Sequence, residues 1–473
     1  MKIRLGLGEL KMSDVAQYCE GTLCENTNTE ASVRYVCTDS READRETMFV
    51  ATRGERVDGH DYILSAIENG CECVLCEYIP EGARDKASFV TVKDSVEAFS
   101  LCAKGYRKSA PIKTVAITGS VGKTTTKELC AAIIRRERSL YATEGNFNSV
   151  IGMPMSLMAV GEDKDSAVFE MGMSGFGEIR SMTRAATPLV AMVINVGSSH
   201  LEYLKTRDNI ALAKLEIAEG LRAGGVLLLN GDEPLLRKHV KAGDYKTVYV
   251  GTENGEDCEI VVENIRVGED GTRFDLVFFG ERIDSLKINL IGKQFATNAA
   301  FAASASLLMG ISQDAVRLGL CDYVPSSMRQ NIYEKDGVRV ISDCYNAAPE
   351  SMRAAIDTLC AIKTDGNRIA VLGDMRELGE DSVRMHREIG EYAAKTGVDM
   401  IFTLGEFGAK IAEAARISGI DAQNIYSEGD TENTGSLSEA IKERMRAGDV
   451  ILFKASRGVR LERVIDLLSL EKE

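Results

Sequence analysis

The sequence predicts an α/β protein of three domains, and three observations lead to this prediction. The chain has 473 residues, about three times the usual domain length of roughly 150 residues. Short apolar runs typical of strands alternate with helical stretches along most of the chain. One such run, at 114–118, passes through a glycine turn directly into a helical stretch, an arrangement found at the ligand-binding edge of parallel sheets.

Residues 1–95 are predicted to form a small α/β domain. Strand-like runs at 47–51 (TMFVA) and 72–76 (ECVLC) flank a helix-like stretch at 61–70 (DYILSAIENG). Their short lengths and their apolar residues are typical of buried strands beside one covering helix.

Residues 96–325 are predicted to form a central domain around a mostly parallel, doubly wound sheet. A helix at 94–111 (DSVEAFSLCAKGYRKSAP) should connect this domain to the first one and stop at Pro111. The strand-like runs that follow lie at 114–118, 167–172, 189–197 and 225–231.

Residues 326–473, which follow Pro325, are predicted to form a third α/β domain. Its strand-like runs are again separated by helical stretches, and the sequence leaves their order in the sheet open. These runs lie at 338–343, 368–374, 399–405 and 449–455.

Composition excludes several functional classes. The formal net charge of −15 argues against nucleic acid and acidic membrane surfaces as partners. We find neither a signal peptide nor a run of roughly 18 apolar residues, so we expect a cytoplasmic protein without membrane insertion. The twelve cysteines are then expected to be reduced. The cluster of Cys71, Cys73 and Cys76 is either a metal site or a set of buried thiols, and the lack of nearby histidines favours burial.

The stretch 114–133, TVAITGSVGKTTTKELCAAI, predicts a phosphate-binding loop. Gly119 and Gly122 allow a tight turn, so that backbone N–H groups converge at the start of the next helix and attract an anion. The Lys123 ammonium adds positive charge, and the Thr124 hydroxyl is placed to bind Mg²⁺. The GxxGKT spacing is two residues shorter than the common form of this loop. The alternative is a plain glycine turn beside a solvated lysine.

Two further residues follow predicted strands of the central domain. Glu170 and His200 could bind a metal there, because ligands gather at the carboxyl ends of parallel strands. Each also has an ordinary alternative, a solvated carboxylate or a structural histidine. Lys214 lies in a helical stretch and reads as a surface lysine, without a role that the residues alone would indicate.

The chain resembles the Mur ligases, the cytoplasmic enzymes that add amino acids to a peptidoglycan precursor. The stretch TGSVGKTTTKE at 118–128 has the short loop spacing of this family. The resemblance covers nearly the whole chain. Its other matching stretches are DSRE at 39–42, RGERVDGHDYI at 53–63, EGNFNSVIGMP at 144–154, FEMGMSGFGEI at 169–179, SSHLE at 198–202, ALAKLEI at 211–217, DCYNAAPESM at 343–352, VLGDMRELG at 371–379 and KASRGVRLE at 454–462.

The resemblance implies an architecture and an activity. It implies a small N-terminal domain that binds the UDP-linked substrate, a central ATP-binding domain of the P-loop type and a Rossmann-like C-terminal domain. The stretches GHDYI, YNAAPESM and LGDMRELG resemble the family member that joins D-alanyl-D-alanine to UDP-N-acetylmuramoyl-tripeptide, with ATP as substrate and Mg²⁺ as cofactor. A DNPR-type signature of the ligase that adds the third amino acid is absent from the sequence. A monomer is expected.

The resemblance also implies roles for single residues. Lys123, Glu170, His200 and Lys214 would be catalytic, with Thr124 and Glu170 on one Mg²⁺ and His200 on a second. Lys214 would be carbamylated by carbon dioxide to become a metal ligand, which requires a lowered pKa of its amine. The residues implied in ATP binding are Gly119, Ser120, Val121, Gly122, Lys123, Thr124, Thr125, Asn298, Arg329, Asp343 and Asn346. Those implied in binding the UDP-linked substrate are Ser40, Arg41, Asn146 and Asn148.

The sequence departs from the family pattern at Gln294, Met328, Ser342 and Ala348, which leaves nucleotide contacts and dipeptide specificity less defined than the phosphate chemistry.

The implied mechanism phosphorylates the terminal carboxylate of the tripeptide, and the amine of the dipeptide then displaces phosphate. Two alternatives share the loop. One is another Mur ligase or a folylpolyglutamate synthase, and the other is a nucleotide-dependent switch, although the NKxD motif of GTPase switches is absent.

Overall fold

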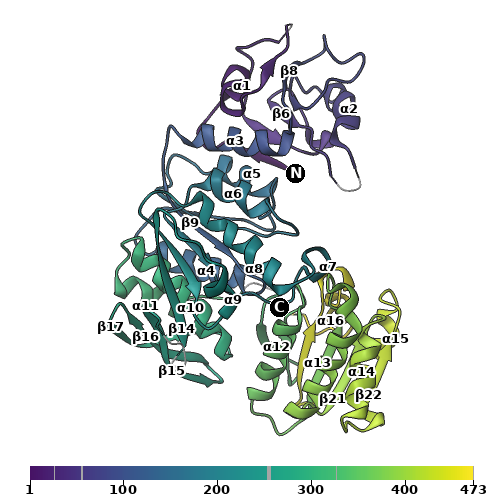
Figure 1. Cartoon of the computed structure of the whole chain (residues 1–473). Helices are drawn as coiled ribbons and strands as arrows, with labels where there is room; N and C mark the ends of the chain where they lie inside the picture. Colours follow the sequence, from purple (N-terminus) through teal and green to yellow (C-terminus); the bar gives the residue numbers. More distant parts are fainter. Residues whose placement is uncertain (26, 55–56, 253–256, 326–327, 472–473) are drawn as a thin grey trace.

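The computed structural model confirms a three-part α/β architecture. It describes residues 1–25, 27–54, 57–252, 257–325 and 328–471. Three α/β units follow one another along the chain in Figure 1, from the N-terminal unit in purple through the central unit in blue and green to the C-terminal unit in yellow-green. The exact domain boundaries that the sequence suggests remain predictions.

The N-terminal unit is built on a six-stranded sheet whose four inner strands are parallel, with one antiparallel strand at each edge. Helices α1 (Met12–Cys19) and α2 (Ile63–Glu68) pack on it, and β2 (Leu10–Lys11) pairs with β4 (Ser32–Val33). The sheet strands in spatial order are β1 (Lys2–Arg4), β5 (Tyr35–Cys37), β6 (Thr47–Val50), β7 (Cys73–Cys76), β8 (Ser88–Thr91) and β3 (Thr22–Leu23).

The cysteine cluster lies in this N-terminal sheet. Cys73 and Cys76 are the end residues of β7 and point to opposite faces of the sheet, where both are buried; Cys71 is buried next to the strand. Within the described part of the chain, no group of three or more His, Cys, Asp or Glu side chains could hold a metal ion. Burial raises the pKa of Cys73 and Cys76 to about 12, so these thiols pack as small apolar side chains.

The central unit contains a nine-stranded sheet. Its first seven strands in spatial order are parallel, which confirms the predicted mostly parallel sheet, and the last two are antiparallel additions. The sequence analysis identified four of the parallel strands and missed the other three and both additions. The strands in spatial order are β10 (Leu140–Ala142), β11 (Ser166–Glu170), β9 (Lys113–Thr118), β12 (Val190–Val193), β13 (Gly225–Asn230), β14 (Tyr245–Thr252), β15 (Ile260–Gly268), β16 (Gly271–Phe278) and β17 (Glu281–Ile288).

Helices cover the central sheet. The longest described one, α10, packs on β15 and β16 and is rich in alanine, which lets it lie close to the sheet. The helices of this unit are α4 (Lys123–Ile134), α5 (Gly152–Ala159), α6 (Glu178–Ala186), α7 (Leu201–Leu204), α8 (Arg207–Leu215), α9 (Pro234–His239), α10 (Lys293–Leu308) and α11 (Gln313–Cys321).

The C-terminal unit is a six-stranded sheet that is parallel except for one edge strand. Its strands in spatial order are β18 (Asn331–Lys335), β19 (Val338–Ser342), β23 (Val450–Lys454), β20 (Arg368–Gly373), β21 (Met400–Leu404) and β22 (Ile425–Glu428). Its helices are α12 (Pro349–Ala361), α13 (Ser382–Thr396), α14 (Gly408–Ile417), α15 (Thr434–Arg444) and α16 (Glu462–Leu467).

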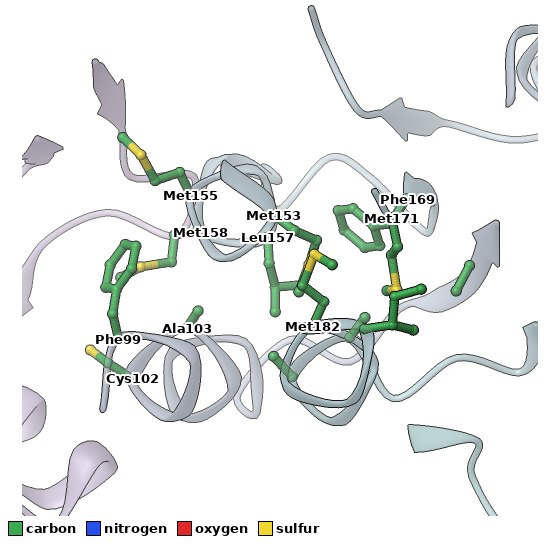
Figure 2. Close-up of a cluster of buried hydrophobic side chains, with 14 of the residues drawn as sticks. Phe99, Cys102, Ala103, Met153, Met155, Leu157, Met158, Phe169, Met171 and Met182 are labelled. Atoms are coloured by element: carbon green, nitrogen blue, oxygen red, sulfur yellow. The ribbon is translucent and has the colours of Figure 1, made fainter. Parts of the chain in front are cut away.

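The N-terminal and central units meet at a methionine-rich contact that we call the apolar seam. Helix α3 (Ser95–Arg107) packs here against α5 and α6, as Figure 2 shows. Helix α5 is apolar on all sides, which is typical of a helix buried on every face. The seam consists of Phe99, Cys102, Ala103, Met153, Leu157, Met158, Phe169, Met171 and Met182, each at most 2% exposed. It belongs to one continuous core that runs from Leu5 to Leu236.

Candidate functional site

The predicted phosphate loop lies between β9, the third strand of the central sheet, and α4. Gly122 has a φ of 80°, in the left-handed region that favours glycine. A Cβ atom at Gly122 would lie 2.8 Å from the Asn298 side chain, so Asn298 packs directly on the loop. Helix α4 begins at Lys123, and its first N–H groups face the same turn.

Asn195 fixes the loop, a role that the sequence analysis did not assign. Its Oδ1 accepts hydrogen bonds from the backbone N–H groups of Ser120 and Val121 at 2.9 and 3.0 Å, and its Nδ2 donates to the Val121 carbonyl at 2.8 Å. These two amides are therefore taken by a side chain, which corrects the expectation that they point freely at an anion. The available signal was a polar residue directly after a buried apolar run.

Lys123 folds back over the loop. Its Nζ donates to the carbonyls of Gly119 at 2.8 Å and Ser120 at 3.3 Å. Burial lowers the pKa of the Lys123 ammonium, and the nearby Glu170 carboxylate opposes this shift. The cation is thus held in the loop where phosphate oxygens would replace the two carbonyls as its partners.

Glu170 connects three parts of the central unit. It is the last residue of β11, is buried, and accepts hydrogen bonds through its two carboxylate oxygens. The Thr124 hydroxyl donates to one oxygen at 2.7 Å, and the Asn148 amide donates to the other at 2.8 Å. The structure therefore brings the predicted metal ligands Thr124 and Glu170 together and adds Asn148, which resemblance had assigned to the UDP-linked substrate.

His200 differs from its predicted position at a strand end. Strand β12 ends at Val193, and His200 instead precedes α7 with a φ of 68°. Its Nδ1 lies 2.6 Å from the Glu377 carboxylate of the C-terminal unit. This close contact with His200 lowers the pKa of Glu377. His200 is thus oriented by a residue from another unit, a partner that sequence spacing did not reveal.

Lys214 is not a surface lysine, which corrects the interpretation from the residues alone. Its side chain in α8 is 1% exposed. Burial, together with the Lys123 charge, brings the pKa of Lys214 well below its ordinary value. This is the lowered pKa that the family resemblance requires of a lysine that reacts with carbon dioxide.

The four implied nucleotide contacts come from two units of the chain. Asn298 packs on it from α10, whereas the Arg329 guanidinium stacks on the Tyr345 ring at 3.8 Å. Asp343 and Asn346 follow β19. A buried lysine, Lys454, joins them: its Nζ donates to the Asp343 carboxylate at 2.6 Å and to the Asn346 carbonyl at 3.1 Å. The sequence analysis quoted the stretch around Lys454 but gave that residue no role.

The residues implied in binding the UDP-linked substrate are not all gathered. Ser40 and Arg41 lie in a short 3₁₀ turn of the N-terminal unit, where Arg41 bonds to the Asp39 carboxylate at 2.6 Å. Asn146 is exposed, and its carbonyl accepts from the Asn148 backbone at 2.7 Å. Of the four, Asn148 alone has a hydrogen bond to the Glu170 cluster in the described part of the chain.

The four departures from the family pattern have ordinary local contacts. The Gln294 side chain fills the space over Gly292, and Ser342 lies 3.7 Å from the Cys344 thiol. The Met328 sulfur accepts from Arg457 at 3.2 Å, and Ala348 precedes α12. None of these contacts disturbs the loop.

Comparison with known families gives three matches along the chain. Residues 117–306 match the model of the Mur ligase middle domain, and residues 328–457 match that of the Mur ligase glutamate ligase domain. Residues 32–107 match the model described as the Mur ligase family catalytic domain.

Whole proteins match over nearly the full chain. The UDP-N-acetylmuramoyl-tripeptide–D-alanyl-D-alanine ligase of Bacillus subtilis is 35% identical over 96% of this chain and 97% of that protein. A crystal structure of MurF from Acinetobacter baumannii superposes with a TM-score of 0.88 at 27% identity and covers 99% of this chain and all of that one. MurF from Thermotoga maritima in complex with ADP gives 0.80 at 30% identity, covering 92% and 97%.

The match to the Mur ligase middle domain covers the loop described above. The middle-domain match begins inside β9 and includes the phosphate loop, Glu170 and Lys214.

None of the described helices is both long and apolar enough to cross a membrane.

Proposed function

Because the chain belongs to the Mur ligase family, we propose that it joins D-alanyl-D-alanine to UDP-N-acetylmuramoyl-tripeptide, with conversion of ATP to ADP and phosphate. The observation that carries this proposal is similarity over nearly the whole chain to ligases with that name, at up to 35% identity. The phosphate loop and the buried Glu170 cluster supply a matching site.

The reaction needs an activated carboxylate, because a free carboxylate has a poor leaving group. The terminal carboxylate oxygen of the tripeptide attacks the γ-phosphorus of ATP, which forms an acyl phosphate and releases ADP. The dipeptide amine then attacks the acyl carbon, loses a proton and expels phosphate, which leaves an amide. Lys123 and the N-terminus of α4 reduce the repulsion between the anionic reactants.

Mg²⁺ is the proposed cofactor, and the residues present fit it. The Thr124 hydroxyl and the Glu170 carboxylate offer hard oxygen ligands within 2.7 Å of each other. A bound Mg²⁺ would neutralise phosphate charge. Lys214 would add a further oxygen ligand after carbamylation, since its neutral amine can add to carbon dioxide with loss of a proton. His200, which Glu377 orients, is the proposed ligand of a second ion.

The substrate residues remain proposals of the same kind. Four residues are assigned to the UDP-linked substrate: Ser40, Arg41, Asn146 and Asn148. Asn298, Arg329, Asp343 and Asn346 are assigned to the nucleotide. We further propose that the protein acts as a monomer in the cytoplasm, where ATP and the soluble precursor occur.

The direct test is a ligation assay with purified protein, ATP, Mg²⁺ and a panel of tripeptide acceptors, in which mass spectrometry identifies the product. We expect an amide with D-alanyl-D-alanine, and ADP release that requires both acceptor and dipeptide. ADP release without either would reject the proposal. A product with glutamate or a single amino acid instead would indicate a folylpolyglutamate synthase or a different Mur ligase, and a nucleotide response without any amide would indicate a switch.

Two substitutions test the site itself. Lys123→Ala should abolish turnover while circular dichroism shows an intact fold, because the phosphate charge loses its partner. Lys214→Ala should be inactive but recover partly with added acetate or propionate, which replaces the missing carboxylate. Full activity of the unrescued Lys214 variant would exclude carbamylation.

A further inference from the structure

The central and C-terminal units meet through a polar contact that lies close to the phosphate loop. Residues 197–200 lie between β12 and α7, and α7 lies beside the C-terminal unit in Figure 1. Glu350, in the first turn of α12, reaches this segment. Its Oε1 accepts hydrogen bonds from both the backbone N–H and the hydroxyl of Ser198, each at 2.9 Å. We call these contacts, with the His200–Glu377 pair, the polar seam.

The same segment also holds the phosphate loop. The Gly197 N–H donates to the Ser120 hydroxyl at 2.8 Å. A Cβ atom at Gly197 would lie 2.9 Å from the Glu350 carboxyl group, so only a glycine lets the carboxylate lie flat against the backbone here. Two adjacent residues thus connect the C-terminal unit on one side to the phosphate loop on the other.

The chemistry of Glu350 is unusual for a residue that serves only stability. Its second oxygen, Oε2, is buried and has no hydrogen-bond partner among the described residues. A buried carboxylate oxygen without a partner lowers stability. In contrast, the two hydrogen bonds from Ser198 go to a charged oxygen, and such bonds are directional and stronger than neutral ones. The contacts of Glu350 therefore indicate that its role is to hold Ser198 in place, and that it contributes little to the stability of the fold.

We propose that Glu350 is a positioning residue that couples docking of the C-terminal unit to the geometry of the phosphate loop. When the unit docks, Glu350 fixes Ser198 and Gly197, and Gly197 in turn fixes the Ser120 hydroxyl. When it undocks, this support of the loop is lost. Phosphoryl transfer is therefore fast only in the docked state, in which the C-terminal unit also supplies Asp343 and Asn346. This inference rests on the proposed ligase function.

The test compares Glu350→Ala, Glu350→Gln and Ser198→Ala. We expect Glu350→Ala to lower kcat about tenfold, the effect of losing hydrogen bonds to a charged group. Glu350→Gln should stay within about threefold of wild type, because its amide oxygen accepts the same two hydrogen bonds. The melting temperature and the KM for the UDP-linked substrate should change little. Glu388→Gln is the matched control, since Glu388 pairs with Arg353 inside the C-terminal unit.

Coupling between the two partners distinguishes positioning from a general structural role. The losses of Glu350→Ala and Ser198→Ala should be less than additive in the double variant, whereas Glu388→Gln should add independently. The proposal is wrong if Glu350→Ala has a kcat within twofold of wild type, or if Glu350→Gln is as impaired as Glu350→Ala. If Glu350→Ala does not fold, Ser198→Ala decides, because it removes the hydroxyl that donates to Glu350; a kcat within twofold of wild type for that variant would reject the proposal. Failure of the wild-type protein to form an amide would instead reject the proposed function.

Discussion

The apolar seam and the polar seam bound the central unit with opposite chemistry. The apolar seam buries aromatic, aliphatic and methionine side chains in one core that spans the N-terminal and central units (Figure 2). The polar seam has instead two carboxylates of the C-terminal unit, Glu350 and Glu377, against Ser198 and His200. The apolar cores of the C-terminal unit form their own clusters, which Ile291 of the central unit joins, and Leu201 packs against both one of these clusters and the core at the apolar seam.

This difference indicates which boundary can move. Separation of the apolar seam would expose many side chains to water at about 25 cal/mol per Å² of apolar surface. Water can replace the partners in the polar seam, where a hydrogen bond contributes only about 0.5–1.5 kcal/mol, or up to about 3 kcal/mol when one group is charged. We therefore expect the N-terminal and central units to move as one body and the C-terminal unit to dock and undock during turnover.

The largest expected effect comes from breaking the apolar seam. Phe99→Ala should lower the free energy of unfolding by about 3–5 kcal/mol, because a fully buried ring is replaced by a cavity. Urea unfolding followed by circular dichroism measures this change. Leu101→Ala, at an exposed position of the same helix, is the control and should stay within about 1 kcal/mol. If the two variants lower the free energy of unfolding equally, burial in the apolar seam does not contribute the stability that we expect from it.

A smaller effect on stability, but a clear one on rate, is expected in the polar seam. Glu377→Gln should change the free energy of unfolding by less than about 1 kcal/mol, because the pair with His200 is partly exposed. Ligation should slow about tenfold as His200 loses its charged partner. Glu380→Gln, an exposed neighbour, is the control. A Glu377→Gln variant with wild-type kcat would mean that the polar seam has no role in turnover.

The smallest expected effect is a pH-dependent opening confined to the polar seam. The contact with His200 lowers the pKa of Glu377 from the ordinary glutamate value of 4.5. The docking contribution is therefore complete above that value and is lost as the pH falls through the lowered pKa. Small-angle scattering should show a larger radius of gyration only at such acidic pH, and Glu377→Gln should remove this step. An increase that the variant retains would place the transition elsewhere.

Local sequence patterns were sufficient for much of the fold and for the centre of the site. The apolar runs at 114–118 and 225–231 became β9 and β13, and the glycine turn before Lys123 became the phosphate loop. These features depend on residues that are close together in the chain, so they can be predicted directly from the sequence. The sequence analysis did not identify the antiparallel strands β16 and β17, because their pairing in the sheet depends on contacts that no local run of residues indicates.

The sequence by itself determined the α/β class, the alternation of strands and helices, and the residue types at the phosphate loop, because each follows from periodicity or from the conformational freedom of glycine. Tertiary structure alone decided that Asn195 would hold the loop, that Lys214 would be buried, and that Glu350 and Glu377 would meet Ser198 and His200. Some of these partners lie more than 150 residues apart. Burial and hydrogen bonding between distant segments depend on how complete units pack, which no local pattern records.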